Sequence, residues 1–505
     1  MSDNNSYLET TTRQLSSLQR TLILLTLTLV TMLYAMTVTI ANVALPQMQG
    51  SLSATQDQIA WVVTFNIVAT AAATPLAGWL AARLGRRRLM ILAVLIFAIA
   101  SLLCGLANSV EELVIYRIIQ GASGAPLVPM SQAIVVDTYP KEQHSRVTAI
   151  WGVGVILGPI IAPTLGGYLT EALNWRWVFF MILPFTFASL IGVLLFIRDR
   201  KKSEKIKLDW TGFLALAVAI GSLQLMLDRG ERNDWFESIE TILELVIAIA
   251  AMYIFVVQIT TADKPFLNPR MLRDGNFSIG LLIAFAFGML NFTPITILPS
   301  LLQELQGYPD SVIGLVLSAR GVGTLVGFFC MAFAGKIDPR IPLSIGFLLQ
   351  AAAGYAMWQF DINLTISDVV WTTGIQGLGV GLMWVPLSVI TFSTLSPKFV
   401  PDGTAIFHLL RNIGSSVHIS VSIALIIRTT NVSYAEMTEY VSPYNKNFNI
   451  PSVSGAWGIE STEKILEIGS EVMRQSMMIG YINSFAFFAL TALIALPLVL
   501  MIRRR

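Results

Sequence analysis

The chain has 505 residues, of which 54% are apolar and only 13% are charged. A soluble protein typically carries about a quarter charged residues, so this composition excludes a string of ordinary soluble domains and also excludes disorder. The 33 basic and 31 acidic residues nearly balance, which gives no basic surface for nucleic acid. Cys104 and Cys330 lie inside apolar runs, so neither a disulfide framework nor a zinc site is expected. A lipid bilayer is the implied solvent.

Apolar segments long enough to cross a bilayer follow one another along the chain. The polar segment 1–20 comes first, and no small-residue cleavage site follows the next apolar run, so we expect a retained first span and no signal peptide. The pattern predicts an all-α polytopic membrane protein with fourteen transmembrane helices. The expected spans lie near 21–44, 58–80, 88–108, 112–136, 146–169, 177–197, 209–228, 238–260, 277–301, 311–335, 340–360, 368–393, 403–428 and 479–502.

Basic residues gather in the connecting segments of one side. The opposite loops, such as PQMQGSLSATQD and LQELQGYPDS, contain none. By the positive-inside rule both termini face the cytoplasm, which an even number of helices also requires. The basic segments are GRRRL at 85–89, RDRKKSEKIK at 198–207, Lys264 with Arg270 and Arg273, and Arg503, Arg504 and Arg505.

One outer segment, 429–478, is rich in Tyr, Asn, Ser and Glu. It is too polar to span a bilayer and too long for a tight turn. We expect an external loop with a short helix near 460–475. Two interpretations stay open, a structural filler and a docking surface.

The two halves of the chain repeat each other at a nearly constant offset. Val128, Pro129 and Ser131 match Val385, Pro386 and Ser388; Ala77 and Gly78 match Ala334 and Gly335; Pro140 and Lys141 match Pro397 and Lys398. With a one-residue slip, Ile119, Gln120 and Gly121 match Ile375, Gln376 and Gly377, and Thr148, Ala149 and Ile150 match Thr404, Ala405 and Ile406.

This repeat predicts two six-helix bundles, at 21–200 and 266–505, with two inserted helices between them at 201–265. Parallel halves related by an axis along the membrane normal place a substrate site between them near the midplane. Rocking of one half against the other then gives alternating access.

The segment GWLAARLGRRR, from Gly78 to Arg88, resembles the cytoplasmic signature of the major facilitator superfamily. Further segments resemble the same family: TIANVALP at 39–46, YRIIQG at 116–121, GVILGPIIAPTLGG at 154–167 with its Gly-Pro antiporter pattern, and NWRWVFFMILP at 174–184. LDWTGFLALAVAIGSLQLMLDRG, from Leu208 to Gly230, resembles the first extra helix of the fourteen-helix drug:proton antiporters, the EmrB/QacA-like branch. The resemblance covers essentially the whole chain and is greatest to the EmrB side.

The resemblance implies a gate at the cytoplasmic rim and a seal in the fifth span that favours export over import. Ala82 stands where the family signature has Asp, and Asp137 can still pair with Arg86. Glycines allow close helix approach at such positions. The expected gating residues are Gly78, Arg83, Gly85, Arg86, Asp137, Gly158 and Pro159.

The expected proton-coupling residues are Arg117, His408 and Arg411. An intramembrane arginine is costly and usually functional, and in the family the position of Arg117 tunes a nearby proton carrier. The acidic residue that such antiporters carry in the first span aligns with Thr37, so the obvious protonation site is missing. His408 could carry the proton, but a neutral histidine packed against a neighbouring helix is the alternative.

Asp228 and Asp368 lie at span ends and are expected to be solvated caps. Arg320 is a further charge drawn into the spans, and His418 lies on the same helix as His408.

Polar and aromatic side chains interrupt several otherwise aliphatic spans. They line a wet substrate cavity or make interhelical hydrogen bonds, and the sequence leaves both interpretations open. The expected substrate-binding residues are Tyr34, Asn42, Asn66, Gln120, Asn291, Phe292, Gln376 and Trp384.

The sequence thus predicts a proton-driven exporter of hydrophobic small molecules in a bacterial inner membrane. An exporter of one endogenous product, such as a siderophore-like metabolite or a lipid, with atypical or absent proton coupling is the alternative. A membrane-embedded enzyme ranks below both, because no HExxH or cofactor signature occurs and no cofactor is expected. The expected partners are hydrophobic substrates, protons and membrane lipids, and the EmrB resemblance implies a periplasmic adaptor and an outer-membrane channel.

Overall fold

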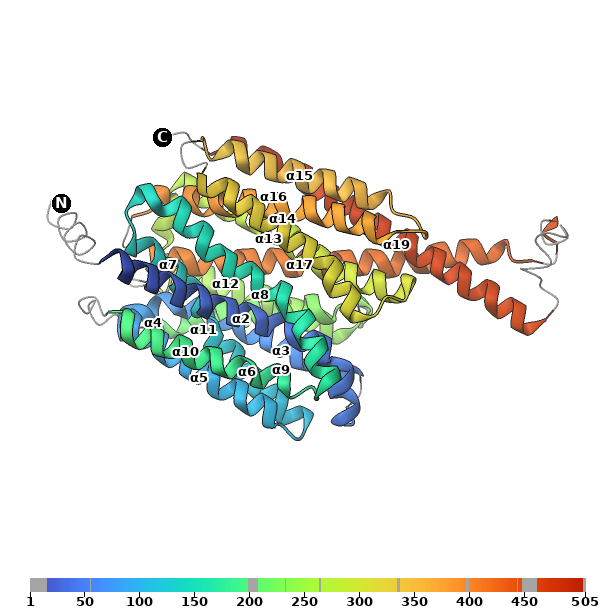
Figure 1. The fold of residues 1–505 in the computed structure, drawn as a ribbon, viewed down its shortest axis with the longest axis horizontal. Helices are drawn as coiled ribbons and strands as arrows, with labels where there is room; N and C mark the ends of the chain where they lie inside the picture. Colours follow the sequence, from blue (N-terminus) through green and yellow to red (C-terminus); the bar gives the residue numbers. More distant parts are fainter. Residues whose placement is uncertain are drawn as a thin grey trace.

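The computed structural model describes residues 16–54, 56–198, 208–231, 233–262, 265–333, 337–396, 399–442, 444–446 and 461–502. Within these ranges the chain forms helices and turns and no β-strand, so the predicted all-α class is confirmed. The helices run side by side in one elongated bundle (Figure 1).

The N-terminal half begins at a capped helix. Ser16 accepts a hydrogen bond from the backbone of Gln19, and the Gln19 side chain accepts one in return, a capping box that fixes where the first helix starts. The helices of this half are α2 (Ser17–Ser51), α3 (Gln56–Ala73), α4 (Leu76–Leu84), α5 (Arg86–Leu106), α6 (Val110–Gly124), α7 (Leu127–Thr138), α8 (His144–Ala172), α9 (Trp177–Phe180) and α10 (Ile182–Phe196), with a 3₁₀ turn at Lys141–Gln143.

Two of the predicted spans are broken in the middle. The second divides into α3 and α4, which are bent by 57° next to Pro75. The fourth divides into α6 and α7 next to Pro126. Proline lacks the N–H that a continuous helix needs, which explains both breaks.

The C-terminal half contains longer helices. Aspartate and threonine side chains cap two of them, with Asp274 accepting from Phe277 N and Thr365 from Asp368 N. The Asp368 carboxylate in turn accepts a hydrogen bond from Thr365 N, so its predicted role as a helix cap is confirmed. The helices are α13 (Gly275–Gln306), α14 (Asp310–Phe333), α15 (Arg340–Trp358), α16 (Ile366–Ser393), α17 (Val400–Glu439) and α19 (Thr462–Leu500).

The inserted pair, α11 (Trp210–Arg229) and α12 (Ile239–Thr261), lies between the halves in sequence and touches both in space. Ser420 of α17 donates a hydrogen bond of 2.6 Å to the carbonyl of Leu227, and Thr64 of α3 donates to Asp228. α11 therefore links the two halves. α12 packs on α11 and leaves side chains such as Ile249 and Tyr253 exposed, as expected of a helix that faces lipid.

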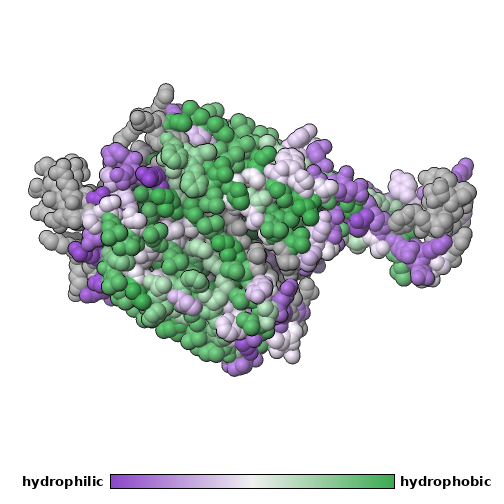
Figure 2. Space-filling view, in the orientation of Figure 1, coloured by the Kyte–Doolittle hydropathy of each residue, from purple (hydrophilic) through white to green (hydrophobic). Residues whose placement is uncertain are grey.

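In the described ranges, eleven helices are long and apolar enough to cross a membrane, or twelve when α3 and α4 count as one bent span. The two other predicted spans coincide with α6–α7 and with α8, which are helical. The count of fourteen is consistent with this and stays a prediction. An apolar surface covers the flank of the bundle, and polar surface lies at its two ends (Figure 2), as in a membrane protein.

The segment 429–478 differs from the predicted loop. α17 continues to Glu439 and α19 starts at Thr462, so the two helices project together from the bundle as a helical hairpin (Figure 1). The short helix expected near 460–475 is the first part of α19, and residues 447–460 lie outside the described part. Hydropathy did not predict these helical sections because it identifies only segments that are buried in lipid. A solvated helix is stabilised instead by side-chain pairs such as Arg474 with Glu471.

α2 begins and α19 ends at the same end of the bundle, opposite the hairpin (Figure 1). We call these the termini end and the hairpin end. The arginine-rich turn between α4 and α5 lies at the termini end, together with the start of α17.

Candidate functional site between the two halves

A buried arginine organises the N-terminal half. Arg117 of α6 is fully buried and donates to the carbonyl of Val62 on α3 at 3.1 Å, to that of Thr37 on α2 at 3.3 Å, and to Gln120 Oε1 at 2.7 Å. Asn66 donates to the Arg117 carbonyl at 2.8 Å. A guanidinium stays charged and offers five donors, so one side chain here ties three helices together.

The C-terminal half contains a matching network around Arg320 of α14. Its guanidinium donates to Gln376 Oε1, and to both the carbonyl and the side-chain oxygen of Asn291 at 2.7 Å. Gln376 in turn donates to Gln350 of α15 at 3.0 Å. Each half thus has a buried arginine whose partners are amides and carbonyls, and in the described part of the chain no carboxylate pairs with either one.

Between the halves lies a cluster of aromatic and polar side chains. His408 Nε2 of α17 lies 2.6 Å from Gln132 Oε1 of α7, which is a direct hydrogen bond across the interface. The ring centroids of Trp151 on α8 and Trp384 on α16 are 6.4 Å apart across the same interface. Gly152 makes this approach possible, because a Cβ there would lie 3.2 Å from Trp384 Nε1.

Several polar atoms in this cluster are buried without a partner. Trp384 Nε1, His408 Nδ1 and Gln132 Nε2 have no hydrogen-bond partner among the described residues, and the same holds for the Oγ atoms of Ser131 and Ser388. Leaving such groups unpaired in a dry interior costs about 1–3 kcal/mol each. They mark the interface between the halves as a place for water, a proton or a substrate.

Arg411 lies one helical turn from His408 on α17. Its guanidinium lies 5.3 Å from the Trp384 ring and 5.8 Å from the Phe292 ring, and its only described side-chain hydrogen bonds are to the neighbouring Asn412. Gly288 of α13 lies directly against the Arg411 backbone, which brings α13 and α17 together at this level. Tyr34 of α2 packs against Phe97, with ring centroids 6.4 Å apart.

The halves also meet at the termini end. Gly78 of α4 lies against the Asp402 side chain at the start of α17, so a Cβ at position 78 would overlap that carboxylate. Arg86 and Asp137 form the ion pair that the sequence predicts. Gly85 has φ 84°, a conformation that favours glycine, and it turns the chain from α4 into α5. Arg83 lies over the Trp79 ring at 5.1 Å.

The seal expected in the fifth span is a close contact between helices. A Cβ on Gly158 of α8 would lie 2.6 Å from the Met32 carbonyl and 2.9 Å from the Met36 nitrogen on α2. Pro159 follows in the same helix. The position is therefore occupied by backbone packing within the N-terminal half.

The predicted substrate-binding residues divide into two groups. Phe292 and Trp384 lie around Arg411 and Tyr34 packs against Phe97, whereas the amides of Asn66, Gln120, Asn291 and Gln376 are used in hydrogen bonds within each half. In this conformation these four amides make interhelical hydrogen bonds, which is one of the two interpretations that the sequence leaves open. The Asn42 side chain lies outside the described part.

Sequence reasoning missed Gln132, Trp151 and Asp402, because nothing in a single helix reveals what faces it from the other half. It noted Arg320 without giving it a role, although an intramembrane arginine is itself the signal. His418 is a histidine packed against neighbouring helices. Its Nδ1 lies 2.8 Å from Thr293 Oγ1, and its ring stacks on Phe487 at a centroid distance of 4.7 Å. In the described ranges no group of three His, Cys, Asp or Glu side chains could hold a metal ion.

Two helical halves that meet around a polar cluster define a membrane transport protein of the alternating-access class. The sequence profile of the Major Facilitator Superfamily matches residues 27–418. The chain belongs to this superfamily, as the sequence predicts.

Named relatives agree with this assignment. The chain is 34% identical to the Multidrug export protein EmrB of Escherichia coli over 438 residues, 86% of each chain. It is 31% identical to the Fatty acid resistance protein FarB of Neisseria gonorrhoeae over 466 residues, 91% of this chain and 92% of that one.

Solved structures show the same fold. The human organic anion transporter MFSD10 matches with a TM-score of 0.61 at 15% identity, over 96% of this chain and 100% of that one. The proton:xylose symporter XylE matches with a TM-score of 0.61 at 13% identity, over 96% and 95%. EmrB is named as an export protein, MFSD10 as a transporter and XylE as a symporter.

Proposed function

We propose that this protein is a secondary active multidrug exporter that moves hydrophobic small molecules out across the cell inner membrane in exchange for protons. The cluster around Trp384, His408 and Gln132 carries this proposal, because it joins the two halves at the depth where alternating access needs a substrate site. The likeness to EmrB supports export of many compounds. With the basic turn inside, both termini face the cytoplasm.

The proposed cycle uses the contacts between the halves. Contact of Gly78 with Asp402, together with the Arg86–Asp137 pair, keeps the termini end closed. Opening that end separates Gln132 from His408 and exposes the cluster to the cytoplasm. His408 then takes part in proton exchange, and the fixed charge of Arg411, one helical turn away on α17, makes a proton there sensitive to what is bound nearby.

Purified protein in liposomes with an imposed pH gradient tests this function. We expect a hydrophobic dye to accumulate against its own gradient only when protons flow the opposite way. Liposomes without protein and liposomes treated with a protonophore are the controls. Dye movement that is the same with and without the pH gradient would contradict proton exchange.

One observation favours the alternative, an exporter of a single endogenous product without such coupling. At the position where related antiporters carry an acid, Thr37 donates its hydroxyl to Leu33 of its own helix at 2.8 Å, and its carbonyl receives Arg117. Arg117 thus has only a neutral partner at position 37, whereas related antiporters have a carboxylate there. Gradient-independent transport of one compound out of a broad panel would favour this alternative.

We also propose that the helical hairpin of α17 and α19 docks a periplasmic adaptor that leads to an outer-membrane channel. The hairpin projects well beyond the apolar belt (Figure 2), and it is joined within itself by contacts such as Ser476 Oγ with Met437 Sδ at 3.7 Å. A projection made of two packed helices suits docking, since it loses little conformational entropy on binding.

Shortening this hairpin should separate two activities. Removing matched turns from α17 beyond Ser433 and from α19 before Ser476 should leave dye transport in liposomes intact, because the membrane bundle is unchanged. The same variant should lose drug resistance in cells and lose co-purification with an adaptor. Recovery of the adaptor with the shortened protein would contradict the docking role.

A further inference from the structure

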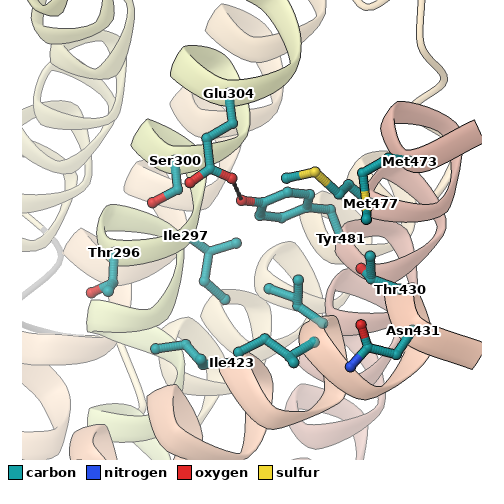
Figure 3. Close-up of a pocket in the computed structure, with 12 residues that line it drawn as sticks. Thr296, Ile297, Ser300, Glu304, Ile423, Thr430, Asn431, Met473, Met477 and Tyr481 are labelled. Atoms are coloured by element: carbon teal, nitrogen blue, oxygen red, sulfur yellow. Dashed lines mark hydrogen bonds between the residues drawn. The ribbon is translucent and has the colours of Figure 1, made fainter. Parts of the chain in front are cut away.

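A pocket lies outside the central cluster, between α13, α17 and α19 towards the hairpin end (Figure 3). Its volume is about 410 Å³, within the range of small-molecule sites. Half of its twelve lining residues are aliphatic or thioether: Ile297, Ile423, Ile426, Ile427, Met473 and Met477. Methionine is flexible and polarizable, so this wall can adapt to differently shaped apolar bodies.

One carboxylate stands at this apolar wall. Glu304 of α13 accepts a hydrogen bond from the Tyr481 hydroxyl of α19 at 3.1 Å (Figure 3), and in the described part of the chain no lysine, arginine or histidine pairs with it. Arg474, next to Met473, is held by Glu471 at 2.8 Å. An ionised carboxylate can accept about four hydrogen bonds, so most of its capacity is free.

Thr430 also belongs to the lining of the pocket, but its hydroxyl faces a neighbouring helix. Thr430 of α17 is only 7% exposed, and its Oγ1 makes no hydrogen bond to any described residue. Thr430 lines the pocket across from Glu304 (Figure 3). The hydroxyl oxygen lies at the contact of α17 with α19, where a Cβ on Gly480 would come within 2.7 Å of it, and it is closed off from the pocket.

The pocket is separate from the central cluster. Glu304 follows Phe292 by twelve residues on α13, which corresponds to about 18 Å along a helix. The two places also differ in charge, because the central cluster holds Arg411 and the pocket holds an unpaired carboxylate. A hydrophobic cation is therefore repelled by the first and attracted by the second.

We propose that this pocket is a second ligand site, which binds hydrophobic monovalent cations. The charge of the ligand lies against Glu304 and the Tyr481 ring, and its apolar body lies among the isoleucine and methionine side chains. The Tyr481 face adds a cation–π contact to the carboxylate attraction.

Equilibrium binding of two ions of equal shape and opposite charge tests this inference. Full-length protein in a non-ionic detergent should bind tetraphenylphosphonium, and Glu304→Gln should weaken this binding about tenfold or more, since the charge is lost while shape is kept. Glu436→Gln, an exposed carboxylate of α17 outside the pocket, is the matched control and should bind like the wild type. Tetraphenylborate should not show the dependence on Glu304.

Labelling locates the ligand. In a Cys330→Ser background, a cysteine introduced by Met473→Cys should react several-fold more slowly with maleimide when tetraphenylphosphonium is present. The inference is overturned if Glu304→Gln binds the cation like the wild type, if Glu436→Gln weakens binding equally, or if the cation gives Met473→Cys no protection. Melting temperatures of all variants in detergent show that each is folded. Both experiments measure binding, so their results do not depend on whether the protein exports its substrates in exchange for protons.

Discussion

Replacing Gly78 by valine should lower export about tenfold while leaving the protein folded. Gly78 lies against the Asp402 side chain where α4 of one half meets α17 of the other. Valine would place three carbons in that contact, and overpacking of this kind costs about 1–3 kcal/mol. Since about 1.4 kcal/mol is tenfold in an equilibrium, the population closed at the termini end should fall about tenfold. An exporter that cannot close this end cannot expel its substrate.

Removal of the obstructing group should restore part of the activity. Asp402→Ala takes away the carboxylate that the valine would strike, so the double variant Gly78→Val with Asp402→Ala should export better than Gly78→Val alone. Such coupling is expected only of side chains in direct contact. Gly50→Val is the matched control, because no described atom lies within 4 Å of a Cβ at Gly50. Dye transport in liposomes and melting temperature are the measurements, and equal loss of activity in Gly78→Val and Gly50→Val would contradict the gate.

The sequence predicts the architecture well because hydropathy and internal repetition are properties of single segments. The all-α fold and the helix positions follow from such local patterns, whereas the superfamily and the Arg86–Asp137 pair follow from the family resemblance. The ends of α17 and α19 do not, because a solvated helix has no hydropathy signal. Their polar sections stay helical without lipid around them.

The internal sequence repeat predicts some residues of the site and not others. Gln120 and Gln376 match in sequence, and each accepts a hydrogen bond from a buried arginine. The arginine comes from the same helix in the first half, as Arg117, and from a neighbouring helix in the second, as Arg320. Comparison of the two halves of the sequence finds the matching glutamines. It does not find that the arginine comes from a different helix in each half, because this depends on how the helices pack.

Contacts between the halves are the least predictable part. Gln132 and His408 are separated by 276 positions, and they meet only because α7 and α17 come together at the interface. Hydropathy identifies both as polar residues in spans. Which of the two faces another helix, and which faces a substrate, depends on the arrangement of the two bundles.

His408→Gln should disconnect transport from the proton gradient. A glutamine can keep a hydrogen bond to Gln132 across the interface, but it cannot bind or release a proton near neutral pH. The halves should therefore still meet and bind substrate, while gradient-driven accumulation in liposomes should fall to the level seen without a gradient. Exchange of labelled for unlabelled dye, which needs no proton, should persist.

His418→Gln provides the matched comparison on the same helix. His418 is buried within the C-terminal half between Thr293 of α13 and Phe487 of α19, and it makes no described contact with the N-terminal half. Its substitution should lower the melting temperature through lost packing and leave the response to the gradient in place. Because both histidines are buried and only His408 lies between the halves, loss of the gradient response in His418→Gln alone would place proton coupling inside the C-terminal half and contradict a role for the interface.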